Sequence, residues 1–136
     1  MKRKIVSIIL VVCLIFTLLP MDAIADEIAD NKCGDNLTWS LKDGTLTVSG
    51  TGEMYDYGTS SAPWYSFRSS ITKVAVQVGA TRIGCNAFSG CTALTSVDLP
   101  TSITSIGNSA FAYCESLTSV DLPDSITSIG TYAFAS

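Results

Sequence analysis

Apolar positions in the second half of the chain recur with a spacing of 23 residues. Segment 97–113 (VDLPTSITSIGNSAFAY) matches segment 120–136 (VDLPDSITSIGTYAFAS) at 13 of 17 positions, and a more diverged copy, 74–96, matches 97–119 at 10 of 23. Most positions kept in the diverged copy are apolar, so each aligned column is expected to form one line of a common core. The columns are Ile71, Leu94 and Leu117; Val74, Val97 and Val120; Val76, Leu99 and Leu122; Ile83, Ile106 and Ile129; Ala87, Ala110 and Ala133; and Phe88, Phe111 and Phe134.

Each copy begins with a pattern typical of a short strand. The pattern is Leu94-x-x-Val97-x-Leu99. Its last two apolar residues have the period-two spacing of a strand with one face inward. Pro100 ends the strand, because its nitrogen has no hydrogen to donate.

The second part of each copy has helical spacing. After an expected bend at Gly107, the side chains of Ala110, Phe111 and Cys114 are spaced as on one short helical turn facing the core. Asn108 is placed to cap that turn. The sequence therefore predicts one short strand and one helical turn per repeat.

One coil of this length buries too few side chains to offset the entropy of ordering its residues, so coils must stack. A leucine-rich-repeat horseshoe and a parallel β-helix both stack strands in this way. One strand and one helical turn per 23 residues favour the horseshoe. The predicted fold is a β-rich solenoid of α/β repeats over residues 71–136, about 2.7 copies with the third incomplete.

The segment before the repeats predicts a β-hairpin. Residues 37–41 (LTWSL) and 46–48 (LTV) alternate around an Asp43-Gly44 turn. The first coil of a solenoid has an open apolar end that must be covered. Residues 33–70 are therefore predicted to form a capping segment, after a flexible lead over 26–32.

Five aromatic side chains lie within 27 positions of this segment. They either close its core or form an exposed platform on which sugar rings stack. Closing the core is favoured, because covering an apolar end requires large side chains. The five are Trp39, Tyr55, Tyr57, Trp64 and Tyr65.

Residues 1–25 have the three regions of a signal peptide. Basic residues 2–4 precede an uncharged run from Ile5 to Leu19, and the small residues at 23–25 predict cleavage before Asp26. Fifteen apolar residues would form a helix of about 22 Å, shorter than the ~30 Å hydrocarbon core of a bilayer, which argues against a membrane span. The protein is expected to be exported.

The chain from Asp26 onward is acidic. It contains five Lys and Arg residues and eleven Asp and Glu residues, which gives a net charge of −6. This charge repels phosphate backbones and anionic lipid. Nucleic acid and membrane surfaces are not expected as partners, and the oligomeric state is not predicted.

The repeat resembles the BspA-type leucine-rich repeats of bacterial surface proteins. The resemblance is carried by LTSVDLP at 94–100, SITSIG at 102–107, AF at 110–111 and Cys114. CGDNLTW at 33–39 and APWY at 62–65 also resemble the amino-terminal segment that often leads such arrays.

The resemblance covers residues 33–136 and implies a protein that a bacterium secretes or displays on its surface. Some members of the family act as adhesins for host proteins or other cells. Family arrays are usually longer, often with a separate attachment or catalytic module. We therefore expect this chain, which stops within the third copy at Ser136, to be the amino-terminal piece of a longer array.

Catalytic chemistry is poorly represented. The chain has no histidine, which excludes Ser-His and Cys-His pairs and histidine-containing metal sites. Paired carboxylates could hydrolyse glycosides, and Glu53 with Asp56 is the nearest such pair, but their expected place in a cap and loop argues against it. No enzyme activity, cofactor or metal is predicted.

A ligand surface is expected on the outward face of the strands. Asp98 and Asp121 share a column between inward residues, so their side chains should point to solvent about 4.8 Å apart. A calcium site that includes Asp124 is one interpretation. A solvated acidic face is favoured, because calcium usually takes six or more oxygens. The candidate ligand face is Thr95, Ser96, Asp98, Thr118, Ser119 and Asp121.

Four cysteines follow the signal peptide, and three pairings are possible. Cys91 and Cys114 share an inward column with parallel side chains, which favours buried packing over a bridge. Cys85 is expected to be more exposed, and its pairing with Cys33 is left open.

Three functions follow in order of preference. A secreted or cell-surface module could recognise a protein or glycan, which suits extended repeat surfaces without catalytic residues. The repeats could instead be a structural spacer in a larger envelope or secreted protein. Hydrolysis by acidic pairs is the least favoured.

Overall fold

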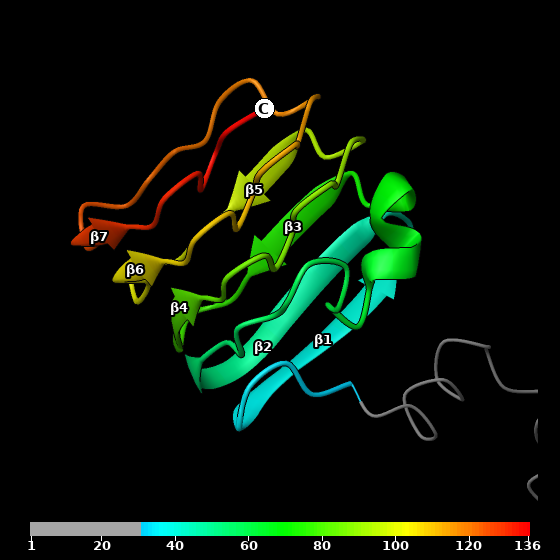
Figure 1. Ribbon diagram of the computed structural model, residues 1–136. Coiled ribbons are helices and arrows are strands. Elements are labelled where there is room, and N and C mark those ends of the chain that lie inside the picture. The colour runs from blue at the N-terminus through cyan, green and yellow to red at the C-terminus, as the bar shows by residue number, and fades with distance from the viewer. Residues whose placement is uncertain (1–30) are drawn as a thin grey trace, which may run out of the picture. The chain divides into compact units, whose positions relative to one another are not determined.

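A computed structural model describes residues 31–136 (Figure 1). The predicted signal peptide and residues 26–30 of the predicted lead lie outside the described residues. Within 31–136, no helix is both long and apolar enough to cross a membrane.

The predicted hairpin is present. Strands β1 (Asn36–Lys42) and β2 (Thr45–Glu53) pair antiparallel, with Lys42 opposite Thr45. The two turn residues, Asp43 and Gly44, have φ of 50° and 81°. Positive φ at both turn positions matches the twist of the flanking strands, and Asp-Gly adopts it readily.

The hairpin is also the first rung of the repeat sheet. The first half of β2 pairs in parallel with β3 (Lys73–Val76). Its last two residues pair with β4 (Ala80–Ile83), with a shift of register between Gly52 and Glu53. The ladder of β3 continues to β5 (Ser96–Asp98), and that of β4 to β6 (Ser105–Ile106) and β7 (Ser128–Ile129). Figure 1 shows both ladders rising from β2.

The first two coils after the hairpin therefore contribute to two ladders and the third to one, although the sequence predicts only one strand per coil. The second strands are two to four residues long. Segments this short do not repeat an alternation often enough to be recognised. Their pairing between coils is non-local, so the pattern within one copy contains no sign of it.

The predicted helical turn is replaced by a tight turn, and no helix forms in residues 71–136. Asn86 and Ser109 have φ of 56° and 55°, which no right-handed helix permits. Alternate backbone N–H groups of this turn donate to the neighbouring coil, and the groups between them donate to the carbonyl three residues back. Phe88 N donates to Ala110 O at 2.7 Å, and Phe111 N donates to the next coil at the same distance.

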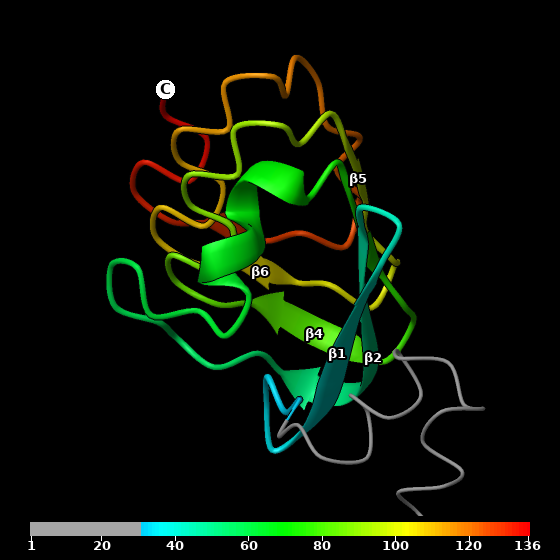
Figure 2. The ribbon, with the colours of Figure 1, turned by 90° about the vertical axis from the view of Figure 1, so that its right-hand side faces the viewer.

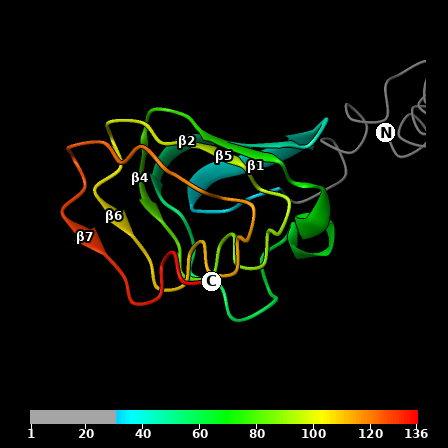
Figure 3. The ribbon, with the colours of Figure 1, turned by 90° about the horizontal axis from the view of Figure 1, so that it is seen from above.

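Asn108 does not cap a helix. Its Oδ1 accepts the backbone N–H of Thr131 in the next coil at 2.8 Å. The turn side of the solenoid is thus a third hydrogen-bonded ladder, and Figures 2 and 3 show the coils stacked there.

The predicted columns line the core in the first two copies. Ile83, Phe88 and Leu94 have no exposed surface, and Ile106 and Phe111 are at most 2% exposed. The third copy is less covered, because no further coil lies on it in the structure. Ile129 is 47% exposed and Phe134 is 38% exposed.

A stack of aromatic rings runs through the coils and into the capping segment. Phe88, Phe111 and Phe134 stack with centroids 5.3 Å apart. Trp64 continues the stack onto Phe88 at 5.4 Å, just before the short 3-10 helix η1 (Tyr65–Ser70). The capping segment and the repeats therefore share one core.

Candidate functional site

The predicted ligand face begins on β3 and β5, whose register fixes which side chains meet. Lys73 lies opposite Ser96, and Ala75 lies opposite Asp98. The Lys73 Nζ is 2.9 Å from Asp98 Oδ2, and these side chains are 43% and 63% exposed. So exposed a pair adds little stability, about 0–1 kcal/mol, but it places two opposite charges at a fixed position on the surface.

Thr95 has a structural role in this face. Its hydroxyl donates to Thr72 O at 3.2 Å, and its backbone N–H donates to the same oxygen at 2.9 Å. Thr104 and Thr127 bind the preceding coil in the same way. Two threonine columns therefore tie coils together, and the Thr95 hydroxyl keeps both lone pairs to accept from a ligand.

The third-coil members of the face, Thr118, Ser119 and Asp121, are exposed but belong to no strand. Thr118 and Ser119 border a hollow of about 310 Å³ whose floor includes Phe111 and Phe134. Asp98 and Asp121 are therefore not neighbours in a regular ladder.

The calcium interpretation of this face gains no support. The ammonium of Lys73 already faces Asp98. Residues 31–136 contain no group of three or more acidic, cysteine or histidine side chains that could hold a metal ion.

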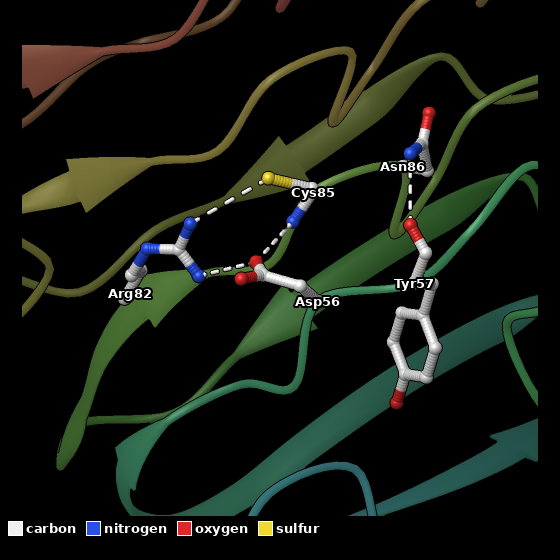
Figure 4. A network of polar contacts seen from close by, with 5 residues as sticks. All are labelled: Asp56, Tyr57, Arg82, Cys85 and Asn86. Carbon is white, nitrogen blue, oxygen red and sulfur yellow. Dashed lines mark hydrogen bonds and ion pairs between the residues drawn. The ribbon is translucent and has the colours of Figure 1, made fainter.

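A second polar site, which the sequence did not predict, joins the capping segment to the first coil (Figure 4). Asp56 Oδ1 accepts Arg82 Nη1 at 2.6 Å and the backbone N–H of Cys85 at 2.9 Å. Arg82 Nη2 donates to Cys85 Sγ at 3.6 Å, and Asn86 Nδ2 donates to Tyr57 O at 2.8 Å. The network crosses from β4 to the loop after β2.

Asp56 holds the first coil in the way that Asn108 holds the third. Each side-chain oxygen accepts the backbone N–H at the same turn position of the following coil, in Cys85 and Thr131. The Cys85 N–H and the Arg82 guanidinium lower the pKa of Asp56 below its ordinary value of 3.8. The ion pair also raises the pKa of Arg82.

The glycosidase interpretation of Glu53 and Asp56 is weakened by this arrangement. The lowered pKa of Asp56 disfavours this carboxyl as the general acid of such a pair. Its Oδ1 already accepts two hydrogen bonds that hold the coil.

The aromatic residues of the capping segment divide into packed and exposed ones. Trp64 is 1% exposed, and the rings of Trp39 and Tyr57 meet it edge-on with centroids 5.4 and 5.7 Å away. Tyr65 lies under the guanidinium of Arg68, 4.0 Å from its ring centroid. Of the five, Tyr55 is the most exposed, at 41%. The preferred interpretation, closing the core, is confirmed for Trp64.

All four cysteines in residues 31–136 are free thiols in the structure. Cys91 and Cys114 are buried in one column, as predicted, and Cys114 Sγ donates to Phe88 O at 3.2 Å. Burial raises the pKa of Cys33 and Cys91 to about 12 and that of Cys114 to about 11. Cys85 is only half-buried and forms no bridge to Cys33.

Parallel strands, stacked 23-residue coils and columns of apolar side chains together define a leucine-rich-repeat horseshoe solenoid. The family model described as "BspA type Leucine rich repeat region (6 copies)" matches residues 61–136. The chain belongs to this family of BspA-type leucine-rich-repeat proteins. No curated protein matches it.

Two solved structures of bacterial leucine-rich-repeat proteins resemble the chain. The protein from Eubacterium ventriosum is 37% identical, with a TM-score of 0.72 over 76% of this chain and 28% of that one. The protein from Bacteroides ovatus is 21% identical, with a TM-score of 0.52 over 77% of this chain and 33% of that one, and it supports the fold alone. The chain thus spans about a third or less of the length of these relatives.

Proposed function

We propose that the protein is an exported, non-catalytic module that recognises a protein or glycan through the outward face of β3, β5 and the coil that follows. The observation that carries this proposal is the exposed Lys73–Asp98 pair, 2.9 Å across, on a strand register that fixes both charges. Opposite charges at a defined separation favour complementary partners and exclude mismatched ones.

The scaffold beneath this face is suited to recognition. The first two coils pair in both strand ladders, the third pairs through β7, and all three are linked through the turn ladder. A surface that is already rigid loses little conformational entropy on binding, so more of the contact energy contributes to affinity. The family is one of repeat proteins without recognised catalytic equipment, which supports a binding role.

The binding proposal can be tested with arrays of extracellular-matrix proteins and polysaccharides probed with the exported protein. The double variant Asp98→Ala with Asp121→Ala should lower the affinity for a captured ligand by about tenfold or more, as expected for residues central to an interface. Glu115→Ala with Asp124→Ala removes the same charge from exposed turn positions and should leave the affinity within about twofold. Equal losses in both variants would contradict the strand-face site.

Export itself has a separate test. The chain should be found outside the cytoplasm of its bacterial host, with an amino terminus at Asp26. Amino-terminal sequencing of protein from the medium and the surface fraction measures this. Protein retained inside the cell with Met1 intact would refute export.

A structural spacer is the second candidate, and the continuous turn ladder favours it. Phe88, Phe111 and the residues around them carry hydrogen bonds from coil to coil without interruption. A rigid array of this kind can hold another module away from its anchor. An attachment or catalytic module in the same reading frame, together with no ligand on the arrays, would favour the spacer over recognition.

A further inference from the structure

A hollow of about 370 Å³ lies at the carboxyl end of β2, between the start of the hairpin and the first coil. Lys73 pairs with the opposite end of the same strand. Asp35 and Asn36 border it from the hairpin, Tyr55 and Asp56 from the loop after β2, and Arg82 from β4. This volume is at the lower end of the range for small-ligand sites, so the hollow suits one compact ligand unit.

The polar groups around the hollow are held in place before any ligand arrives. Arg82 and the Cys85 N–H fix Asp56 Oδ1 at 2.6 and 2.9 Å. The Tyr55 hydroxyl donates to Asp35 Oδ1 at 3.0 Å, and the Tyr55 backbone N–H donates to Cys33 O at 2.8 Å. Tyr55 is therefore anchored at its backbone and at the tip of its ring.

The ring of Tyr55 supplies an apolar surface among these polar groups. It remains 41% exposed, whereas Trp64 is 1% exposed and has its ring covered by its neighbours. A rigid, partly exposed aromatic ring gives a large contact area at low entropic cost.

The balance of donors and acceptors narrows the ligand class. Asp35, Asp56 and Glu53 supply acceptors, while the Arg82 guanidinium and the Asn36 amide supply donors. The three carboxylates disfavour an anion, and the Arg82 guanidinium among them reduces the attraction for a cation. A neutral ligand whose hydroxyls both donate and accept, and whose ring has an apolar C–H face, satisfies all of these groups.

We propose that this hollow is a saccharide subsite in which the ring of Tyr55 packs against the apolar face of one neutral sugar, while Asp35 and the Arg82–Asp56 pair hydrogen-bond its hydroxyls. The proposal goes beyond the strand-face recognition above and uses a different surface.

Saturation-transfer difference NMR on the exported protein tests it, with the methyl glycosides of glucose, galactose, mannose and N-acetylglucosamine as probes. At about 10 mM, a sugar with a Kd of ~1 mM nearly saturates the site. At least one glycoside should receive saturation, strongest at its ring C–H protons. No transfer to any of the four would overturn the proposal.

Two substitutions locate the site. Tyr55→Ala should weaken binding about tenfold or more, since it removes the packing surface. Tyr132→Ala removes a tyrosine that is 72% exposed in the third coil and should leave binding unchanged. Binding retained by Tyr55→Ala, or lost equally in both variants, would overturn the assignment.

Two further measurements keep the result interpretable. Circular dichroism shows whether Tyr55→Ala folds. If it does not, Tyr55→Phe replaces it, because this variant keeps the ring and should retain binding. The sugar should then perturb the NMR resonances of the substituted ring, and unperturbed resonances would overturn the proposal. Nα-acetyl-lysine amide serves as a cationic probe, and its binding in place of every sugar would also overturn the saccharide proposal.

The strand-face variant separates the two proposals. Asp98→Ala with Asp121→Ala should bind the sugar as the unmodified protein does, so the two proposals fail independently.

Discussion

The indole of Trp64 lies on the ring of Phe88, with 5.4 Å between centroids and 17° between planes, and its Nε1 donates to Ala87 O at 2.8 Å. Two elements that the sequence separates, the capping segment and the first repeat, are thereby joined through one stacked contact. The same ring receives Trp39 and Tyr57 edge-on. Trp64 is the central side chain of the cap.

Replacing this side chain should therefore destabilise the whole solenoid. Trp64→Ala should lower the free energy of unfolding by about 3–5 kcal/mol, as expected for a large buried aromatic. Phe134→Ala removes a stacked ring that is 38% exposed and should cost only about 1–2 kcal/mol. Urea denaturation followed by circular dichroism measures both values, and similar costs would argue against Trp64 as the link between cap and repeats.

Asp56 should make stability depend on pH. The pKa of Asp56 is lowered in the folded protein. Its contribution to the free energy of unfolding is therefore complete above the pKa of the unfolded chain, about 3.8, and is lost as the pH falls through the lower pKa of the folded protein. Asp56→Asn keeps an oxygen for the Cys85 N–H, as Asn108 does for Thr131, but loses the pairing with Arg82. It should cost no more than about 1 kcal/mol, because the side chain is 58% exposed.

The comparison that isolates this effect is unfolding measured between pH 7 and pH 2. The difference in unfolding free energy between the unmodified protein and Asp56→Asn should stay constant down to about pH 5 and then shrink as the Asp56 carboxylate is protonated. Asp56→Ala also loses the bond from Cys85 and should cost about 1 kcal/mol more. A pH-independent difference for Asp56→Asn would show that the ion pair contributes nothing.

Gly107 should not tolerate a side chain. A Cβ at this position would lie 2.6 Å from Cys85 N in the preceding coil, closer than carbon atoms approach backbone nitrogen. Gly107→Ala should therefore separate the coils and cost about 1–3 kcal/mol or more. Gly58→Ala is the matched control, because its Cβ would meet only Ser61 Oγ at 3.5 Å. Thermal melts of the two variants that coincide would refute the close approach.

The thiols of the folded domain should differ in reactivity. Cys33, Cys91 and Cys114 are buried, and burial raises the pKa of each to about 11 or 12, so at pH 8 they remain protonated and inaccessible. Cys85 is half-buried and should react first with a thiol-specific chromogenic disulfide. Cys85→Ser should remove the fast phase of this reaction, and the other three should react only in denaturant. A fast phase that survives in Cys85→Ser would mean that the buried column opens readily.

Local patterns predicted the hairpin and the inward columns because these depend on neighbours in sequence. The Asp43-Gly44 turn combines two residues that tolerate positive φ, and it appears where predicted. The column of Phe88 and Phe111 is buried as the 23-residue period requires. Side-chain alternation is a property of one segment and is visible without the fold.

The predicted helical turn did not form because spacing alone does not distinguish a helix from a tight turn. Ala110, Phe111 and Cys114 face the core in either case. What decides between them is the direction of the backbone N–H groups, of which every second one here donates to the adjacent coil. That choice depends on the presence of the next coil.

The Asp56 network escaped prediction for a related reason. Asp56 and Cys85 are 29 residues apart, outside the 23-residue period, so no alignment of repeats places them together. Trp64 is similarly 24 residues before Phe88, one residue out of phase with the ring column it extends. The capping segment copies the shape of a coil without copying its sequence.

The sequence by itself determined the period of the solenoid, the side chains that line its core and the hairpin that precedes it, because hydrophobic alternation and turn preference act within a few residues. Only the tertiary structure decided that the coils meet through two strand ladders and a turn ladder, that Trp64 completes the aromatic stack, and that Asp56 holds the first coil. Those features are hydrogen bonds and contacts between segments more than twenty residues apart, and they exist only once the coils have stacked.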